Sequence, residues 1–126
     1  MNLPHAHHTE KDMQQIAEKI PAAETITAVA DALKQLGDPT RLRIFWILCH
    51  TEQCVVNIAA IMDMSSPAVA HHLRILKEAR LVSTQRIGKE VYYKASDAPI
   101  VGMMHHVIES IASKTCPGNQ NDPSLN

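Results

Sequence analysis

Aromatic residues are scarce in this sequence of 126 residues, which has one Trp, two Tyr and one Phe. A core must therefore be built from Leu, Ile, Val, Ala and Met, and the length suffices for one domain. No apolar run is long enough to span a membrane, and the first residues lack the charged-then-apolar order of a signal peptide. These absences favour a cytoplasmic protein that has no membrane partner.

Cysteine is also scarce. The three cysteines, an odd number, do not suggest the disulfide framework of a small secreted domain. Cys49, Cys54 and Cys116 are therefore expected to be free thiols, metal ligands or redox sites. No nucleophile–base pair and no phosphate-binding glycine loop is recognisable, so an enzyme is not expected. The eight histidines, by contrast, are a high number for this length.

The stretch 64–94 organises the chain, because it reads as one helix followed at once by a β-hairpin. Ser65 and Ser66 offer a hydroxyl N-cap, and Pro67 suits the first helical turn. A buried stripe then recurs at helical spacing, formed by Val69, Leu73 and Leu76. After residue 81 the pattern changes to strand-like alternation, with a turn at Gly88-Lys89.

Basic charge is concentrated on this helix and hairpin. Residues 66–94 contain six Lys or Arg against two Asp or Glu, although the whole chain has a net charge of −1. Ala68, His71 and Arg74 share a small, basic face of the helix, and Arg86 and Lys89 lie at the hairpin tip. This face is suited to approach base edges and phosphates, whereas His72 is expected to pack or bond within the domain.

The remaining pattern predicts further helices at 10–20, 22–36, 40–50, 54–62 and 97–115. Asp38 and Pro39 mark the start of the helix at 40–50, which is apolar nearly all round and is expected to be central. At its start, Arg41 and Arg43 are expected to make ion pairs or phosphate contacts outside the core. A brief turn at 63–65 joins two helices, which together form a helix-turn-helix that the hairpin makes winged.

The last predicted helix carries a long apolar stripe, which favours a homodimer interface. Its members are Ile100, Met103, Met104, Val107, Ile108 and Ile111. The expected organisation is a flexible arm at 1–9, one domain for DNA binding and dimerisation at 10–116, and a disordered tail at 117–126. The fold class is mostly α with a small β-hairpin.

The chain resembles the ArsR/SmtB family of repressors over roughly residues 24–115. The motifs that carry the resemblance are GDPTRLRIFWIL, EQCVVNIAAIMDMSSPAVAHHLRILKEARLV and RIGKEVYY. The resemblance implies a homodimeric winged helix-turn-helix that represses at a palindromic operator until an inducer weakens its binding. The family's recognition helix usually begins Ser-Gln-Ser and continues Val-Ser-His, where this chain has Ser-Ser-Pro and Val-Ala-His. The residues expected at the DNA are Ser66, Pro67, Ala68, Ala70, His71, Arg74, Arg86 and Lys89.

The resemblance also implies two kinds of metal site. Cys54 matches the first ligand of one, and His5, His7 and His8 could supply the rest from the arm, a donor set suited to zinc as inducer. At the second site Asp97 matches, but Pro99 stands where the family has a histidine. The pair His106 and Glu109 has the family's internal spacing but lies one turn too early. A solvated face is expected for His105 and His106, and a role of either residue as a metal ligand stays open.

Two alternatives stay open. Some family members sense sulfide or oxidants through one cysteine on each of two helices, and Cys49 and Cys116 resemble that pair, each about one turn later. For Cys49 alone, a place in the core is also expected. The other alternative is a winged helix that binds protein partners and no longer binds DNA, which the two lost serines would fit.

Overall fold

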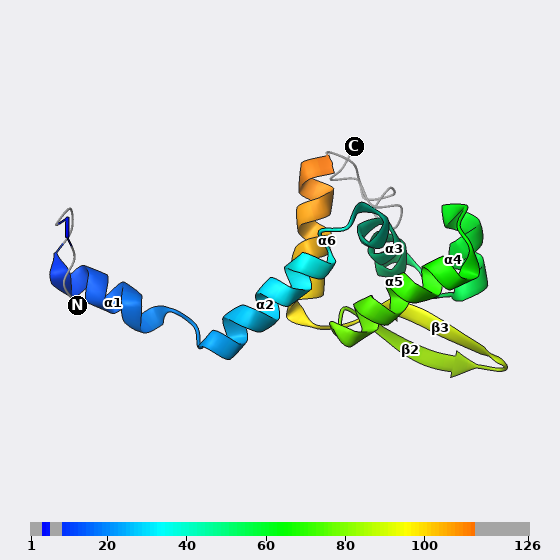
Figure 1. Cartoon of the computed structure of the whole chain (residues 1–126), viewed down its shortest axis with the longest axis horizontal. Coiled ribbons are helices and arrows are strands. Elements are labelled where there is room, and N and C mark those ends of the chain that lie inside the picture. The colour runs from blue at the N-terminus through cyan, green and yellow to red at the C-terminus, as the bar shows by residue number, and fades with distance from the viewer. Residues whose placement is uncertain (1–3, 6–8, 113–126) are drawn as a thin grey trace, which may run out of the picture. The chain divides into compact units, whose positions relative to one another are not determined.

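The computed structural model describes residues 4–5 and 9–112, and the chain divides into two units, Met1–Ala30 and Asp31–Asn126. Figure 1 shows the order of the elements along the chain. Of the predicted sites, His7, His8 and Cys116 lie outside the described residues. The predicted tail at 117–126 lies outside them too, and the proposed domain boundaries stay a prediction.

The first unit contains α1 (Glu10–Lys19) and the start of α2 (Ala23–Gln35). Thr9 caps α1, because its side-chain oxygen accepts a hydrogen bond from the Asp12 backbone N–H at 3.2 Å. Ile20 ends the helix, and Pro21 follows directly. These bounds confirm the predicted helix at 10–20 to within one residue.

In the second unit, α3 (Pro39–His50) begins at the predicted cap and contributes Ile44, Phe45 and Leu48 to the core. The Asp38 carboxylate accepts a hydrogen bond from the Arg41 backbone N–H at 2.9 Å. That hydrogen bond, the first of several causes, lowers the pKa of Asp38. Pro39 occupies the first turn, where its missing N–H costs nothing.

The prediction that Arg41 lies outside the core is wrong. The residue is buried, with only 9% of its surface exposed. Its Nη1 donates to the backbone oxygen and to Oε1 of Gln35 at 3.0 and 2.9 Å. Its Nε donates to Nδ1 of His72 at 3.3 Å. A buried guanidinium needs such acceptors, and here neutral groups supply them. Arg43 is exposed, as predicted.

The helix-turn-helix consists of α4 (Val55–Met62) and α5 (Ser66–Glu78). Asp63 adopts the left-handed conformation with φ of 53°, and the backbone N–H of Met64 donates to the carbonyl oxygen of Ala59 at 3.0 Å. This C-cap ends α4, and only residues 63–65 separate α4 from α5. Ser65 then caps α5 by accepting from the Ala68 N–H at 3.2 Å, which confirms the predicted N-cap.

The predicted two-stranded hairpin is part of a three-stranded antiparallel sheet. Its strands are β1 (Gln53–Cys54), β2 (Val82–Ile87) and β3 (Glu90–Ala95), in the order β1-β3-β2. Cys54 pairs with Tyr92, so the helix predicted from residue 54 begins one residue later. A strand of two residues is too short to show alternation in the sequence. Gly88 has φ of 63° in the two-residue hairpin loop, as such loops require.

The core of the second unit lies where α3, α4, α5 and the sheet meet, and α6 (Pro99–Ala112) packs against it. The helix predicted from residue 97 begins two residues later, at Pro99, and in the preceding turn the Ser96 hydroxyl accepts from the Ala98 N–H at 3.4 Å. On α6, Ile100, Met104 and Ile108 contact the core. Within the described part of the chain, no helix is both long and apolar enough to cross a membrane.

Candidate functional site

Helix α5 separates an apolar inner face from a polar outer face. Val69, Leu73 and Leu76 are completely buried, which confirms the predicted stripe. On the opposite side, His71 and Arg74 are exposed. Exposed side chains also occupy the first turn, at Ser66 and Pro67, whereas Ala68 and Ala70 are half-buried. The N-terminal part of α5 therefore presents small side chains beside the imidazole of His71 and the guanidinium of Arg74.

His72 links α5 to α3 through a side-chain hydrogen bond with Arg41. Its Nδ1 accepts the hydrogen bond from Arg41, which requires an imidazole that carries no proton at this nitrogen. Burial lowers the pKa of His72, and Arg41 and His71 add to that effect while Asp38 opposes it. The neutral ring therefore keeps its contact, and the prediction that His72 bonds within the domain is confirmed.

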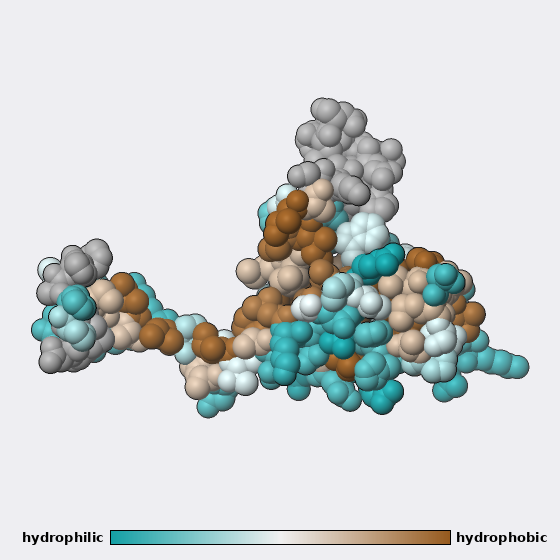
Figure 2. All heavy atoms as spheres, turned by 45° about the horizontal axis from the view of Figure 1, so that its top comes forward, coloured by the Kyte–Doolittle hydropathy of each residue, from teal (hydrophilic) through white to brown (hydrophobic). Residues whose placement is uncertain are grey.

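The hairpin adds two cations to the same unit. Arg86 lies on β2, Lys89 lies in the turn, and both are exposed. Figure 2 shows hydrophilic side chains at the hairpin tip. We call the eight residues predicted at the DNA the α5–wing surface: Ser66, Pro67, Ala68, Ala70, His71, Arg74, Arg86 and Lys89. Its guanidinium and ammonium groups can bind phosphates or base edges.

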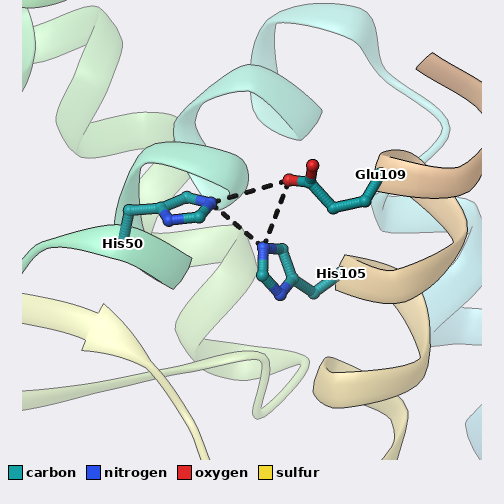
Figure 3. Close-up of side chains that lie close together, drawn as sticks. All are labelled: His50, His105 and Glu109. Atoms are coloured by element: carbon teal, nitrogen blue, oxygen red, sulfur yellow. Dashed lines mark hydrogen bonds and ion pairs between the residues drawn. The ribbon is translucent and has the colours of Figure 1, made fainter. Parts of the chain in front are cut away.

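A second group of polar side chains lies where the end of α3 meets α6. Figure 3 shows His50, His105 and Glu109 pointing toward one another. The two Nε2 atoms are 3.0 Å apart. Glu109 Oε1 lies 3.8 Å from Nε2 of His50 and 3.4 Å from Nε2 of His105. We call these three residues the histidine cluster.

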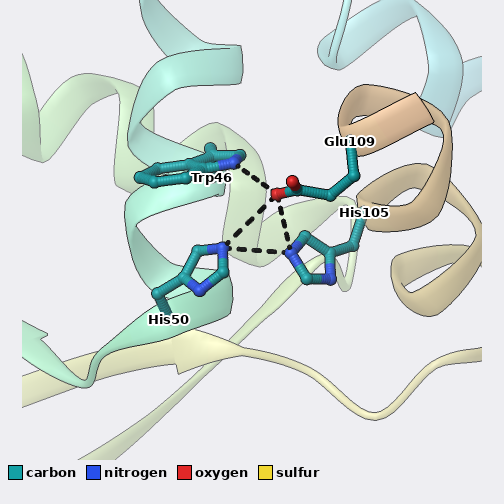
Figure 4. Close-up of polar contacts among 4 residues, drawn as sticks. All are labelled: Trp46, His50, His105 and Glu109. Atoms are coloured by element: carbon teal, nitrogen blue, oxygen red, sulfur yellow. Dashed lines mark hydrogen bonds and ion pairs between the residues drawn. The ribbon is translucent and has the colours of Figure 1, made fainter. Parts of the chain in front are cut away.

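Trp46 lies beside the histidine cluster and contacts two of its residues, Glu109 and His50. Its indole Nε1–H donates to Glu109 Oε1 at 3.1 Å, as Figure 4 shows. Its ring also lies against His50, with ring centroids 4.4 Å apart. Burial lowers the pKa of His50 and His105 lowers it further, whereas Glu109 acts in the opposite direction. A neutral His50 can offer a nitrogen lone pair to a metal ion.

A cavity of about 590 Å³ opens beside the cluster. The ends of α3 and β3 and the first turns of α6 form its walls, and His50 and His105 are among its lining residues. Cys49 and Asp97 line it as well. Solvent therefore reaches the two imidazoles although both side chains are partly buried.

The two described cysteines are both partly or fully enclosed. Cys49 packs against the core, as expected, and burial, reinforced by Glu109, raises the pKa of its thiol to about 12. A thiol in this state is a weak nucleophile. Cys54 is only 7% exposed and pairs in β1. The thiol switch of Cys49 with Cys116 stays a prediction, since Cys116 lies outside the described residues.

The metal sites that the resemblance implies are only partly represented among the described residues. At the first site, Val56 and Asn57 occupy the positions of the later ligands and offer no thiolate or carboxylate, and the Asn57 amide donates to Gln53 at 2.9 Å. The arm contributes only His5 to the described residues, where it is exposed. At the second site, Pro99 offers no ligand and begins α6. Within residues 4–5 and 9–112, the histidine cluster is the one group of three ligands close enough to share an ion.

Comparison with known proteins supports the winged helix-turn-helix. A family model described as "Bacterial regulatory protein, arsR family" matches residues 38–84. The transcriptional repressor SmtB homolog of Synechocystis sp. is 34% identical over 104 residues, which cover 82% of this chain and 78% of that protein. The chain belongs to the ArsR/SmtB family.

Further relatives agree. The cadmium resistance transcriptional regulatory protein CadC homolog of Staphylococcus aureus is 34% identical over 91 residues, covering 71% of this chain and 75% of that protein. A Mycobacterium bovis structure, described as a homodimeric winged helix-turn-helix DNA-binding domain, superimposes with a TM-score of 0.65 at 24% identity. It covers 86% of this chain and 91% of that one, and it supports the fold alone.

As an ArsR/SmtB protein, the chain is a DNA-binding transcriptional repressor. The α5–wing surface stays a prediction for its contacts with DNA, and sequence reasoning did not bring His50, His105 and Glu109 together. His106, which is exposed, was paired with Glu109, whereas the structure uses His105. His106 lies on a solvated face as predicted, whereas the His105 side chain is 28% exposed and contacts His50 and Glu109. Histidine and glutamate four apart on one helix face were a readable signal, but nothing local linked them to His50.

Proposed function

We propose that this ArsR/SmtB repressor reads a palindromic operator as a homodimer in the cytoplasm and leaves it when a divalent metal ion binds. The observation that carries the DNA part is the outer face of α5, where Arg74 and His71 are exposed directly opposite a completely buried stripe. In helix-turn-helix proteins the second helix enters the major groove, and the hairpin reaches the neighbouring backbone. Arg74 would donate to bases or phosphates, and Arg86 and Lys89 to phosphates.

The homodimer is supported by the face of α6 that does not touch the core. Met103, Val107 and Ile111 are 67%, 41% and 79% exposed, and they recur four residues apart. Figure 2 shows hydrophobic side chains gathered along this helix. A second copy would cover this face, and its twofold symmetry would match a palindromic DNA site.

A metal inducer is supported by the relatives and by the ligands that this chain offers. One relative is described as a cadmium resistance regulator, and three described side chains lie within ligand distance of one ion. Cys54 with His5, His7 and His8 remains a second proposal for zinc. Release requires that the ion bind more tightly to the form of the dimer that fits DNA poorly.

The test of DNA reading compares Arg74→Ala with Lys34→Ala, which removes an exposed cation of α2 outside the α5–wing surface. The probe is a duplex selected from a random pool by rounds of binding to the wild-type protein, followed by fluorescence anisotropy. Arg74→Ala is expected to weaken binding about 10- to 100-fold, because one reading side chain contributes about 1–3 kcal/mol. Lys34→Ala should bind like the wild type.

Equal binding by Arg74→Ala and the wild-type protein would show that α5 is not the reading helix. Failure of the pool to yield any bound duplex at low salt would instead favour a winged helix that binds protein partners.

A further inference from the structure

We propose that His50, His105 and Glu109 form a binding site for one divalent cation of zinc-like chemistry, placed between α3 and α6 of a single protomer. The site shares no residue with the set of Cys54, His5, His7 and His8 that was expected to bind an inducer. It rests on the proposed function only for its regulatory role, because binding of the ion can be tested without DNA.

The spacing of the three ligand atoms fits a tetrahedral ion. Their separations are 3.0, 3.4 and 3.8 Å. Bonds of about 2.0–2.2 Å at tetrahedral angles place ligand atoms about 3.3–3.6 Å apart, so the three atoms already outline one face of the tetrahedron. Small rotations of the side chains would even out the edges. Two nitrogens and one carboxylate oxygen are a ligand set that zinc binds in proteins.

The surroundings prepare these groups for a cation. Two Nε2 atoms at 3.0 Å cannot both carry a proton, so at least one lone pair points into the cluster. The Trp46 N–H holds the Glu109 carboxylate in place at 3.1 Å, as an outer partner commonly orients a metal-ligating carboxylate. A divalent cation would also accept a lone pair from each imidazole, and these two bonds would replace the direct contact between the two Nε2 atoms.

The cavity beside the cluster supplies access and a further ligand. His50 and His105 line it, so an ion can reach them from solvent and a water molecule can complete the coordination. Cys49 lies in the same wall, but its sulfur is not part of the group of ligand atoms that lie within 4.8 Å of one another, which come from His50, His105 and Glu109. The expected ligand set therefore contains no sulfur.

The position of the site gives it a route to both the dimer and the DNA. At its C-terminal end α3 carries His50, and at its N-terminal end it carries Arg41, which bonds His72 of the recognition helix. On α6, the ligands His105 and Glu109 alternate along the sequence with Met103 and Val107, whose side chains are exposed. An ion that fixes α6 against α3 would therefore favour one placement of α5 relative to the dimer face.

The test uses the full chain with its arm ligands removed, by the changes His5→Ala, His7→Ala and His8→Ala. Cobalt(II) replaces zinc as the probe, because its absorption reports the ligands. We expect one cobalt per chain, with ligand-field bands and no thiolate-to-cobalt charge-transfer band. His105→Ala should lower the affinity at least about 100-fold, while the neighbouring His106→Ala, an exposed side chain, should leave it unchanged.

Two measurements keep the test independent of folding. Zinc should raise the thermal midpoint of the arm-free chain, since a ligand of the native state stabilises it. Trp46 is the single tryptophan and bonds the Glu109 carboxylate, so cobalt should quench its emission in that chain but not in the Glu109→Gln variant. Far-UV circular dichroism then confirms that each variant is folded.

Equal cobalt affinity of folded His105→Ala and His106→Ala chains would overturn the proposal, as would a charge-transfer band that disappears in Cys54→Ser. Release of DNA is read separately by anisotropy. A chain that binds cobalt at the cluster and yet stays on DNA keeps the site and refutes only its role as the inducer site.

Discussion

The α5–wing surface and the histidine cluster are built in opposite ways. The first gathers exposed cations from one continuous stretch of chain, on a helix whose other face is buried. The second joins partly buried side chains 55 positions apart, with a lowered pKa at His50 and a carboxylate held by Trp46. The exposed surface suits a highly charged polymer in water, whereas the enclosed cluster suits one small ion at short range.

This difference decides how each region should respond to its surroundings. Charges in solvent act over long distances and are screened by salt. Bonds between an ion and neutral imidazoles act at short range and compete with protons. Dependence on salt and dependence on pH therefore distinguish the two regions experimentally.

Salt should produce the largest difference. Arg74, Arg86 and Lys89, doubled in a dimer, would give about six phosphate contacts, so DNA affinity should fall about 10³-fold between about 50 and 200 mM salt. Cobalt affinity of the arm-free chain should change less than about tenfold over the same range. Anisotropy and absorption titrations measure the two. DNA affinity that does not depend on salt would contradict the electrostatic role of the α5–wing surface.

Thiol reactivity should differ next most strongly between folded and unfolded protein. With its pKa raised to about 12, Cys49 is almost entirely a protonated thiol at about pH 8. Its alkylation by iodoacetamide should therefore be on the order of 10² times slower, or more, in the native chain than in urea. Peptide mass spectrometry follows the labelling. Rapid labelling of native Cys49 would revive the thiol switch as the sensor.

Acidification should have the smallest effect. The folded pKa values of His50 and His72 lie below their ordinary value of 6.5, so the unfolded chain takes up protons first. Stability is therefore fully present above about pH 6.5 and is lost as the pH falls below it. Urea unfolding at about pH 7.5 and about pH 5.5 measures the loss.

His72→Asn sharpens this measurement, because an amide oxygen can still accept the Arg41 hydrogen bond but cannot take up a proton there. The variant should lose less stability on acidification than the wild type. The control His106→Asn removes an exposed histidine and should keep the wild-type response. An identical response of all three chains would contradict the pKa assignment for His72.

The sequence predicted the α5–wing surface because its signals are local. Period, caps and charge within one stretch located α5, its N-cap at Ser65 and the turn at Gly88. It could not show that Arg41 turns inward, because Gln35 and His72 become acceptors only once the helices pack. The cluster was missed for the same reason: His50 meets His105 through the packing of α3 against α6, which no spacing reveals.

The measurement that tests the central claim most directly adds zinc to the arm-free protein bound to its selected duplex and follows anisotropy. We predict that the complex dissociates as zinc saturates the site, and that the His105→Ala complex persists at the same zinc concentration. Dissociation of both complexes at equal zinc, or of neither, would contradict the claim that an ion at the histidine cluster controls the α5–wing surface.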